Sequence, residues 1–124
     1  MDDHDEEAVV STDERRKWPR HSAVEKDVRL FWEEEGKIRI CSAQLSDISR
    51  GGALVIAPRP LPEGTLTRIG LTRAVGGIDG VVILSSPLAA REFEVRLEFS
   101  ERCPDAFFRP AVRGIPGTDH RFDS

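Results

Sequence analysis

Apolar and polar residues alternate along most of the middle of the chain, with the two-residue period of β-strands that have one buried face. The alternation is clearest over residues 93–99, where Phe, Val and Leu take every second position and Glu and Arg fill the positions between. The same pattern over residues 28–33 predicts that Trp32 lies in the core and Phe31 on the surface. The other runs of strand length are 38–48, 53–57, 66–71 and 78–84. The chain is therefore expected to be all-β.

Turn-forming residues separate these runs at short intervals. The expected turns and connections lie at residues 35–36, 49–52, 58–64, 76–77 and 87–90. The alternation loses its phase between Leu45 and Ile48, which indicates a β-bulge of the kind found at the corners of barrels. About six strands with short turns and no long helical pattern predict an antiparallel barrel or sandwich.

The two ends of the chain differ in composition from this middle part. Residues 1–14 hold seven of the 22 acidic residues and none of the 18 Lys and Arg residues, so a disordered acidic head is expected. Residues 15–22 are rich in arginine, and Pro19 disfavours a helix there. They are predicted to form the extended arm of a domain that covers residues 15–103. Residues 104–124 are expected to form a short helical turn, with Phe107 and Phe108 as a plug on one end of the barrel, or a flexible tail.

Composition argues against several classes of function. No apolar run approaches the ~20 residues that a membrane span needs, and the acidic start is unlike a signal peptide, so a cytoplasmic protein without membrane insertion is expected. Cys41 and Cys103 lack the paired spacing of a zinc site and are expected to be buried thiols, with no metal bound. The chain has no nucleophile-elbow pattern and no sequence cue for an activating histidine, so an enzyme is not expected. No DNA or RNA partner is expected either, because a strongly basic face is missing.

Two short motifs combine charge with turn chemistry. They are Arg16-x-x-x-Arg20, which Arg15 precedes, and Asp47-x-Ser49-x-x-Gly52. Each has an ordinary structural interpretation, since surface arginines can pair with the acidic head, and Asp and Ser readily bond their own backbone in a turn. Their order is more informative, because an arginine arm is followed by about two strands and then by a polar turn that opens a further strand.

This arrangement resembles the PilZ domain family over residues 15–100. The likeness includes both motifs, the loop with Pro62-Glu63-Gly64 and the late strand Val95-Arg96-Leu97-Glu98-Phe99. It implies a six-stranded antiparallel β-barrel of the split-barrel type, with cyclic di-GMP as the ligand and no cofactor. The ligand-binding residues that it implies are Arg15, Arg16, Arg20, Asp47, Ser49, Gly51 and Gly52.

The chemistry of these side chains agrees with such a ligand. A guanidinium can bind guanine O6 and N7 together, stack on the base or fork onto a phosphate, so Arg16 and Arg20 are predicted to clamp the ligand. The Asp47 carboxylate can accept hydrogen bonds from guanine N1–H and N2–H₂ together, which excludes adenine. Ser49 can donate to a phosphate or to a second guanine. Gly52 is expected either to adopt a positive φ or to permit close approach of the ligand.

The leading hypothesis is a receptor that orders its arginine arm on cyclic di-GMP and signals to an unidentified protein partner. The alternative is a PilZ-like protein–protein adaptor of motility or pilus machinery that binds no nucleotide. A barrel for single-stranded nucleic acid is disfavoured, because two Trp, six Phe and no Tyr form no recognisable basic and aromatic face. Two points stay open: whether Arg50 reaches a phosphate, and whether Trp18 packs on the barrel wall or stacks on a base.

Overall fold

The computed structural model describes residues 18–115, and seven strands and one helix lie within that range. The elements are β1 (His21–Ser22), β2 (Asp27–Glu34), β3 (Lys37–Ile48), β4 (Gly52–Ala57), β5 (Leu66–Leu71), β6 (Gly77–Ala89), β7 (Glu92–Phe99) and α2 (Asp105–Arg113). The acidic head of residues 1–14, together with Arg15 and Arg16, lies outside the described residues.

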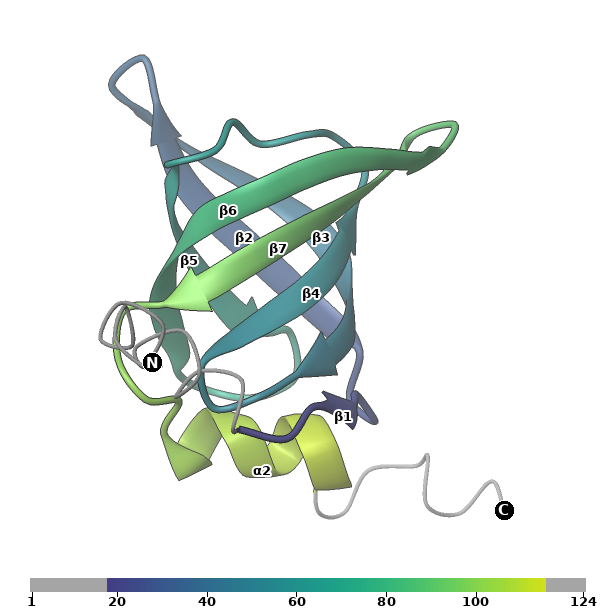
Figure 1. Ribbon diagram of the computed structural model, residues 1–124. Coiled ribbons are helices and arrows are strands. Elements are labelled where there is room, and N and C mark those ends of the chain that lie inside the picture. The colour runs from purple at the N-terminus through teal and green to yellow at the C-terminus, as the bar shows by residue number, and fades with distance from the viewer. Residues whose placement is uncertain (1–17, 116–124) are drawn as a thin grey trace, which may run out of the picture.

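Six of the strands close into one antiparallel barrel (Figure 1). They follow the order β3-β2-β5-β6-β7-β4, and β4 pairs with β3 to complete the circle. The predicted six-stranded antiparallel barrel is therefore confirmed. The seventh strand, the two-residue β1, pairs with the C-terminal end of β3, beyond the residues of β3 that pair with β2.

The core is built from the inward positions of the alternating strands. Leu30, Leu45, Ile69 and Val95 are completely buried, each on a different strand. Trp32 is 5% exposed and belongs to this core, as the alternation predicted, whereas Phe31, which was expected on the surface, is half-buried. Burial of one such side chain stabilises the fold by about 1.5–3 kcal/mol, so the inward positions hold the barrel together.

A β-bulge interrupts β3 where the hydrophobic pattern loses its phase. The register between β3 and β4 shifts between Leu45 and Asp47, which confirms the predicted bulge. Beyond it, Ile48 is again completely buried, while Asp47 is half-buried. The bulge thus returns Ile48 to the core and leaves the neighbouring carboxylate outside it.

The prediction of a connection at residues 87–90 is wrong. Strand β6 continues through Pro87, which pairs with Phe93 of β7, and the hairpin turns at Ala90 and Arg91 instead. Arg91 adopts a positive φ of 61° in that turn. Proline is tolerated here because the ladder shifts its register directly after it, between Pro87 and Ala89.

Helix α2 covers one end of the barrel (Figure 1). A short helical element was expected, and α2 has nine residues. Phe107 and Ala111 are buried, and the Phe107 ring meets Phe99 of β7 edge-on with 6.5 Å between centroids. Cys103, just before the helix, is buried, whereas Cys41 is only half-buried, so the expectation for the two thiols is right for the first alone. No helix within residues 18–115 has the length and apolar character to cross a membrane.

Candidate functional site

A pocket of about 440 Å³ opens on the outside of the barrel wall. Its strand residues include Arg96 and Glu98, which alternate along β7 with buried Val95, Leu97 and Phe99 and therefore face outward. The full lining is Trp18, Pro19, Arg20, Asp47, Ser49, Gly51, Gly52, Ala53, Ile83, Arg96, Leu97 and Glu98. Both sequence motifs contribute to this list, and the pocket lies where they meet.

Strand β1 brings the arginine arm to the polar turn. His21 pairs with Ile48 and Ser22 pairs with Asp47 in antiparallel register. Because the two strands run in opposite directions, Arg20, just before β1, and Ser49, just after β3, lie at the same end of this short ladder. The pocket contains Arg20, Asp47, Ser49, Gly51 and Gly52, and Arg20 is exposed and accessible there.

The turn after β3 is held by its own hydrogen bonds. The Ser49 N–H donates to the Gly52 carbonyl oxygen at 2.9 Å, and the Gly51 N–H donates to Ser49 Oγ at 3.1 Å. The ordinary interpretation of Ser49 as a turn-forming residue is therefore correct. Ser49 also lines the pocket, and a hydroxyl that accepts one hydrogen bond still has a proton to donate to a ligand.

Two adjacent glycines give this turn its close contacts. A Cβ at Gly52 would lie 2.4 Å from the Leu97 carbonyl oxygen of β7, and a Cβ at Gly51 would lie 2.6 Å from the Trp18 ring. The expectation of a positive φ at Gly52 is wrong, because Gly52 is not among the residues that adopt one. Gly52 instead allows β4 to approach β7, and Gly51 leaves room for the indole ring. Trp18 thus packs against the turn while it also lines the pocket.

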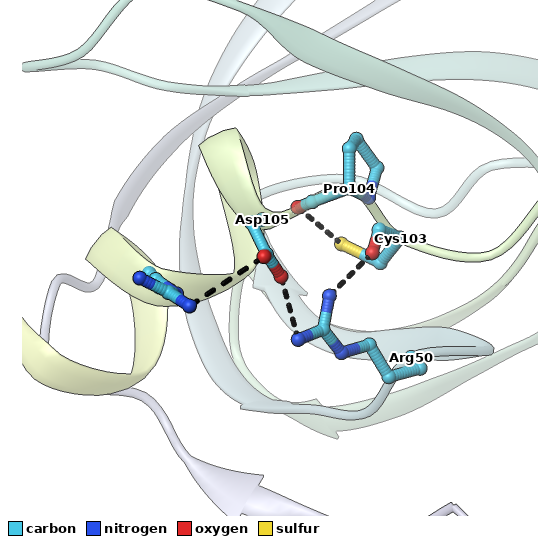
Figure 2. Close-up of polar contacts among 5 residues, drawn as sticks. Arg50, Cys103, Pro104 and Asp105 are labelled. Carbon is cyan, nitrogen blue, oxygen red and sulfur yellow. Dashed lines mark hydrogen bonds and ion pairs between the residues drawn. The ribbon is translucent and has the colours of Figure 1, made fainter.

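The Arg50 side chain does not line the pocket. Figure 2 shows it directed toward the start of α2, where Nη1 donates to the Cys103 carbonyl oxygen at 2.7 Å and Nη2 lies 2.7 Å from Asp105 Oδ1. Its guanidinium carbon stacks 3.9 Å from the centroid of the Phe108 ring. The hydrogen bond from Arg50 holds the pKa of Asp105 below its usual range. In this structure, the Arg50 guanidinium therefore binds at the start of α2 and does not reach into the pocket, where a phosphate would lie.

Several pocket residues were not expected from the sequence. Arg96 and Glu98 come from β7 and Ile83 from β6, and they reach the site through the pairing of β7 with β4, in which Gly52 lies opposite Glu98. The sequence did mark residues 94, 96 and 98 as the polar face of a strand. It offered no signal that this face adjoins the Asp47 turn, because that depends on barrel closure.

A match to a known family agrees with this architecture. The model of the PilZ domain matches residues 14–106, which is most of the chain. This chain belongs to the PilZ domain family. The match includes Arg15, Arg16 and every residue of the second motif, so the resemblance inferred from the two motifs is confirmed.

Two solved structures are similar to this PilZ domain. The PilZ domain of YcgR from Escherichia coli, described with c-di-GMP, aligns with a TM-score of 0.58 and 18% identity over 89% of this chain and 98% of that chain. MrkH, described as a c-di-GMP-dependent transcription regulatory factor, gives a TM-score of 0.49 and 22% identity, over 73% of this chain and 46% of that chain. At such identities the first likeness shows a shared fold. None of the curated proteins matches the sequence.

The pocket of this PilZ domain combines both signs of charge with apolar surface. Arg20 and Arg96 supply guanidinium groups, Asp47 and Glu98 supply carboxylates, and Ile83 adds apolar surface beside them. Within residues 18–115, no three His, Cys, Asp or Glu side chains gather as a metal site would require. The ring of His21, the histidine in this range, meets Phe108 edge-on with 5.6 Å between centroids. Such a pocket is suited to a ligand that carries both anionic groups and hydrogen-bond donors.

Proposed function

We propose that this protein is a cyclic di-GMP receptor and that the pocket between the arm and the Asp47 turn is its binding site. The observation that carries the proposal is the meeting of Arg20 with Asp47, Ser49, Gly51 and Gly52 around one pocket. These residues come from two motifs that lie about two strands apart in the sequence. Membership of the PilZ family and the fold shared with the YcgR domain support the same ligand.

The ligand presents two phosphates and two guanines, and the pocket offers a group for each kind of contact. Arg20 provides a fork for a phosphate or for guanine O6 and N7. The Asp47 carboxylate accepts from guanine N1–H and N2–H₂, and Ser49 Oγ donates to a phosphate or to the second guanine. The pocket volume of about 440 Å³ lies in the usual range for small-molecule sites.

Arg15 and Arg16 lie outside the described residues, so only the sequence motif includes them in this proposal. Both would extend the guanidinium cluster that begins at Arg20. Arg96 lines the wall that faces the turn and supplies a further cation, which the sequence motifs do not include. Fixing each arm residue costs roughly 1–2 kcal/mol, so several charge-assisted hydrogen bonds are needed to hold the arm on the ligand.

The receptor acts by binding and not by catalysis in this proposal. Ordering of the arm on the ligand creates a surface that an unidentified protein partner in the cytoplasm recognises. The rival function, an adaptor that uses the same barrel without a nucleotide, differs in one measurable respect. A receptor is stabilised by its ligand through mass action, and an adaptor is not.

The test is isothermal titration calorimetry of the full chain with cyclic di-GMP, with cyclic di-AMP as the matched control. We expect saturable binding of cyclic di-GMP, a raised melting temperature at saturation, and no heat from cyclic di-AMP. A flat titration and an unchanged melting curve at high cyclic di-GMP would reject the receptor and favour the adaptor.

A further inference from the structure

Helix α2 contacts residues next to both halves of the pocket, although none of its own residues lines the pocket. On one side Arg50, between Ser49 and Gly51 of the turn, places its guanidinium over the face of the Phe108 ring. On the other side His21, next to Arg20, meets the edge of the same ring at an interplanar angle of 83°. The Phe108 side chain of α2 thus touches Arg50 inside the second motif and His21 next to the first.

The backbone of the turn is tied to the same helix. Arg50 accepts a hydrogen bond from the Cys103 N–H at 2.8 Å through its own carbonyl, and its Nη1 donates to the Cys103 carbonyl oxygen at 2.7 Å (Figure 2). Asp105, in the first turn of α2, completes the contact at 2.7 Å from Nη2. The Arg50 side chain is only 18% exposed, whereas that of Asp105 is 55% exposed. The bonds between Arg50 and the Cys103 backbone are therefore the better shielded part of this contact, and the ion pair with Asp105 adds to them at the surface.

The arm is tied to the helix in turn. The N–H groups of Val24 and Glu25, which follow β1, donate to the Ala111 carbonyl oxygen at 2.8 and 3.2 Å. Ala111 itself is completely buried. The segment that follows Arg20 and the turn that carries Ser49 are therefore both bonded to α2, at Ala111 and at Asp105, which lie six residues apart in the helix.

We propose that Arg50 and Asp105 are positioning residues, which use α2 to hold the polar turn and the arginine arm at the spacing that the ligand needs. The inference rests on the proposed function and adds that ligand binding is energetically coupled to the docking of α2. Because such coupling is reciprocal, a ligand that requires the docked helix also stabilises the docking of that helix. Occupancy of the pocket is then transmitted to the end of the barrel that α2 covers.

The test measures cyclic di-GMP affinity by calorimetry in Asp105→Asn, Arg50→Met and the double variant. Each single change should weaken binding about five- to tenfold, a usual size for coupling between sites. The double variant should be no weaker than Arg50→Met alone, because Arg50→Met already removes the ion pair that Asp105→Asn breaks. Asp105→Glu, which keeps the charge, should recover most of the affinity.

Two controls separate positioning from general destabilisation. Arg113→Gln removes an exposed charge from the same helix and should bind as wild type does. Ile69→Val trims a fully buried side chain of β5, so it should lower the melting temperature while its affinity stays within about twofold of wild type. In hydrogen exchange, saturating ligand should slow the amides of residues 105–113 in wild type, and less so in Asp105→Asn.

Folded Asp105→Asn and Arg50→Met variants with wild-type affinity would overturn the proposal. Hydrogen-exchange rates of the α2 amides that do not change at saturating ligand would overturn it as well. If Arg50→Met does not fold, Asp105→Asn decides alone. If wild type fails to bind cyclic di-GMP, the proposed function fails by itself. The positioning role is then judged without ligand, from the amide chemical shifts of Gly51 and Gly52 in Asp105→Asn, and unchanged shifts would reject it.

Discussion

Ser22 pairs with Asp47 across β1 and β3, in a ladder of only two residue pairs. This short ladder is what places the arginine arm against the polar turn, because Arg20 lies just ahead of it in the chain. Two backbone pairs hold the arm weakly compared with a full strand, and β1 precedes a segment that also bonds to α2. The geometry of the pocket thus depends on a small contact that a ligand bridging both sides would strengthen.

Replacement of Arg20 by alanine should weaken cyclic di-GMP binding at least tenfold, because a hydrogen bond to a charged group contributes about 1.5–3 kcal/mol. Arg20 is exposed, so the melting temperature of the free protein should change little. Calorimetry measures the affinity, and Arg113→Ala, which removes an exposed arginine that does not line the pocket, is the matched control. Equal affinities for the two variants would show that Arg20 is not part of the clamp.

The Asp47→Asn substitution tests the recognition of guanine. An amide offers one acceptor and one donor group, so it cannot accept from N1–H and N2–H₂ together, and binding should fall by about tenfold or more. The control is Asp79→Asn, which removes an exposed carboxylate that pairs with Arg68 at 2.9 Å outside this pocket. Titration with cyclic di-GMP and cyclic di-AMP measures selectivity, and an unchanged preference in Asp47→Asn would assign guanine recognition to another group.

The two glycines of the turn should respond differently to alanine. Gly52→Ala places a methyl group against the Leu97 carbonyl, a backbone atom that cannot move aside, so the fold should lose about 1–3 kcal/mol of stability. Gly51→Ala meets only the Trp18 ring, which can rotate away, so its main effect should be on the pocket and on affinity. Thermal melts and calorimetry distinguish the two outcomes, and a Gly51→Ala variant less stable than Gly52→Ala would contradict this account.

The two thiols should differ in reactivity in the folded protein. Burial raises the pKa of the Cys103 thiol to about 12, against opposing effects of Arg50 and Arg102, and burial also raises the pKa of the half-exposed Cys41. Since the thiolate is the reactive form, iodoacetamide at pH 8 should modify Cys41 well before Cys103. Peptide mass spectrometry after timed quenching measures both rates, and equal rates under native conditions would show that Cys103 is not held as described.

The raised pKa of the Cys103 thiol also predicts that the folded state loses stability at high pH. The folded state keeps the proton of Cys103, whereas the unfolded chain releases it above about pH 8.5. The contribution of the buried thiol is therefore complete below that pH and declines as the pH rises toward 12. A Cys103→Ala variant, compared with wild type by denaturant unfolding at several pH values, should lack this decline.

The sequence determined the strands and the bulge, because alternation of apolar and polar residues is a local signal with a physical cause. Each residue of a strand points to the opposite side from its neighbour, so a half-buried strand must show the two-residue period. The phase break before Ile48 was visible for the same reason. The two motifs, and through them the family, were equally local, since each lies within six residues.

What the sequence could not determine was which segments meet. The extension of β6 through Pro87 depends on a partner strand that tolerates a missing donor, and the positions of Arg96 and Ile83 beside the turn depend on how the barrel closes. Arg50 lies inside a binding motif by sequence and yet turns toward α2, more than 50 residues later in the chain. Only the tertiary structure decides such matters, because burial and pairing with Asp105 and Phe108 outweigh the local preference of an arginine for solvent.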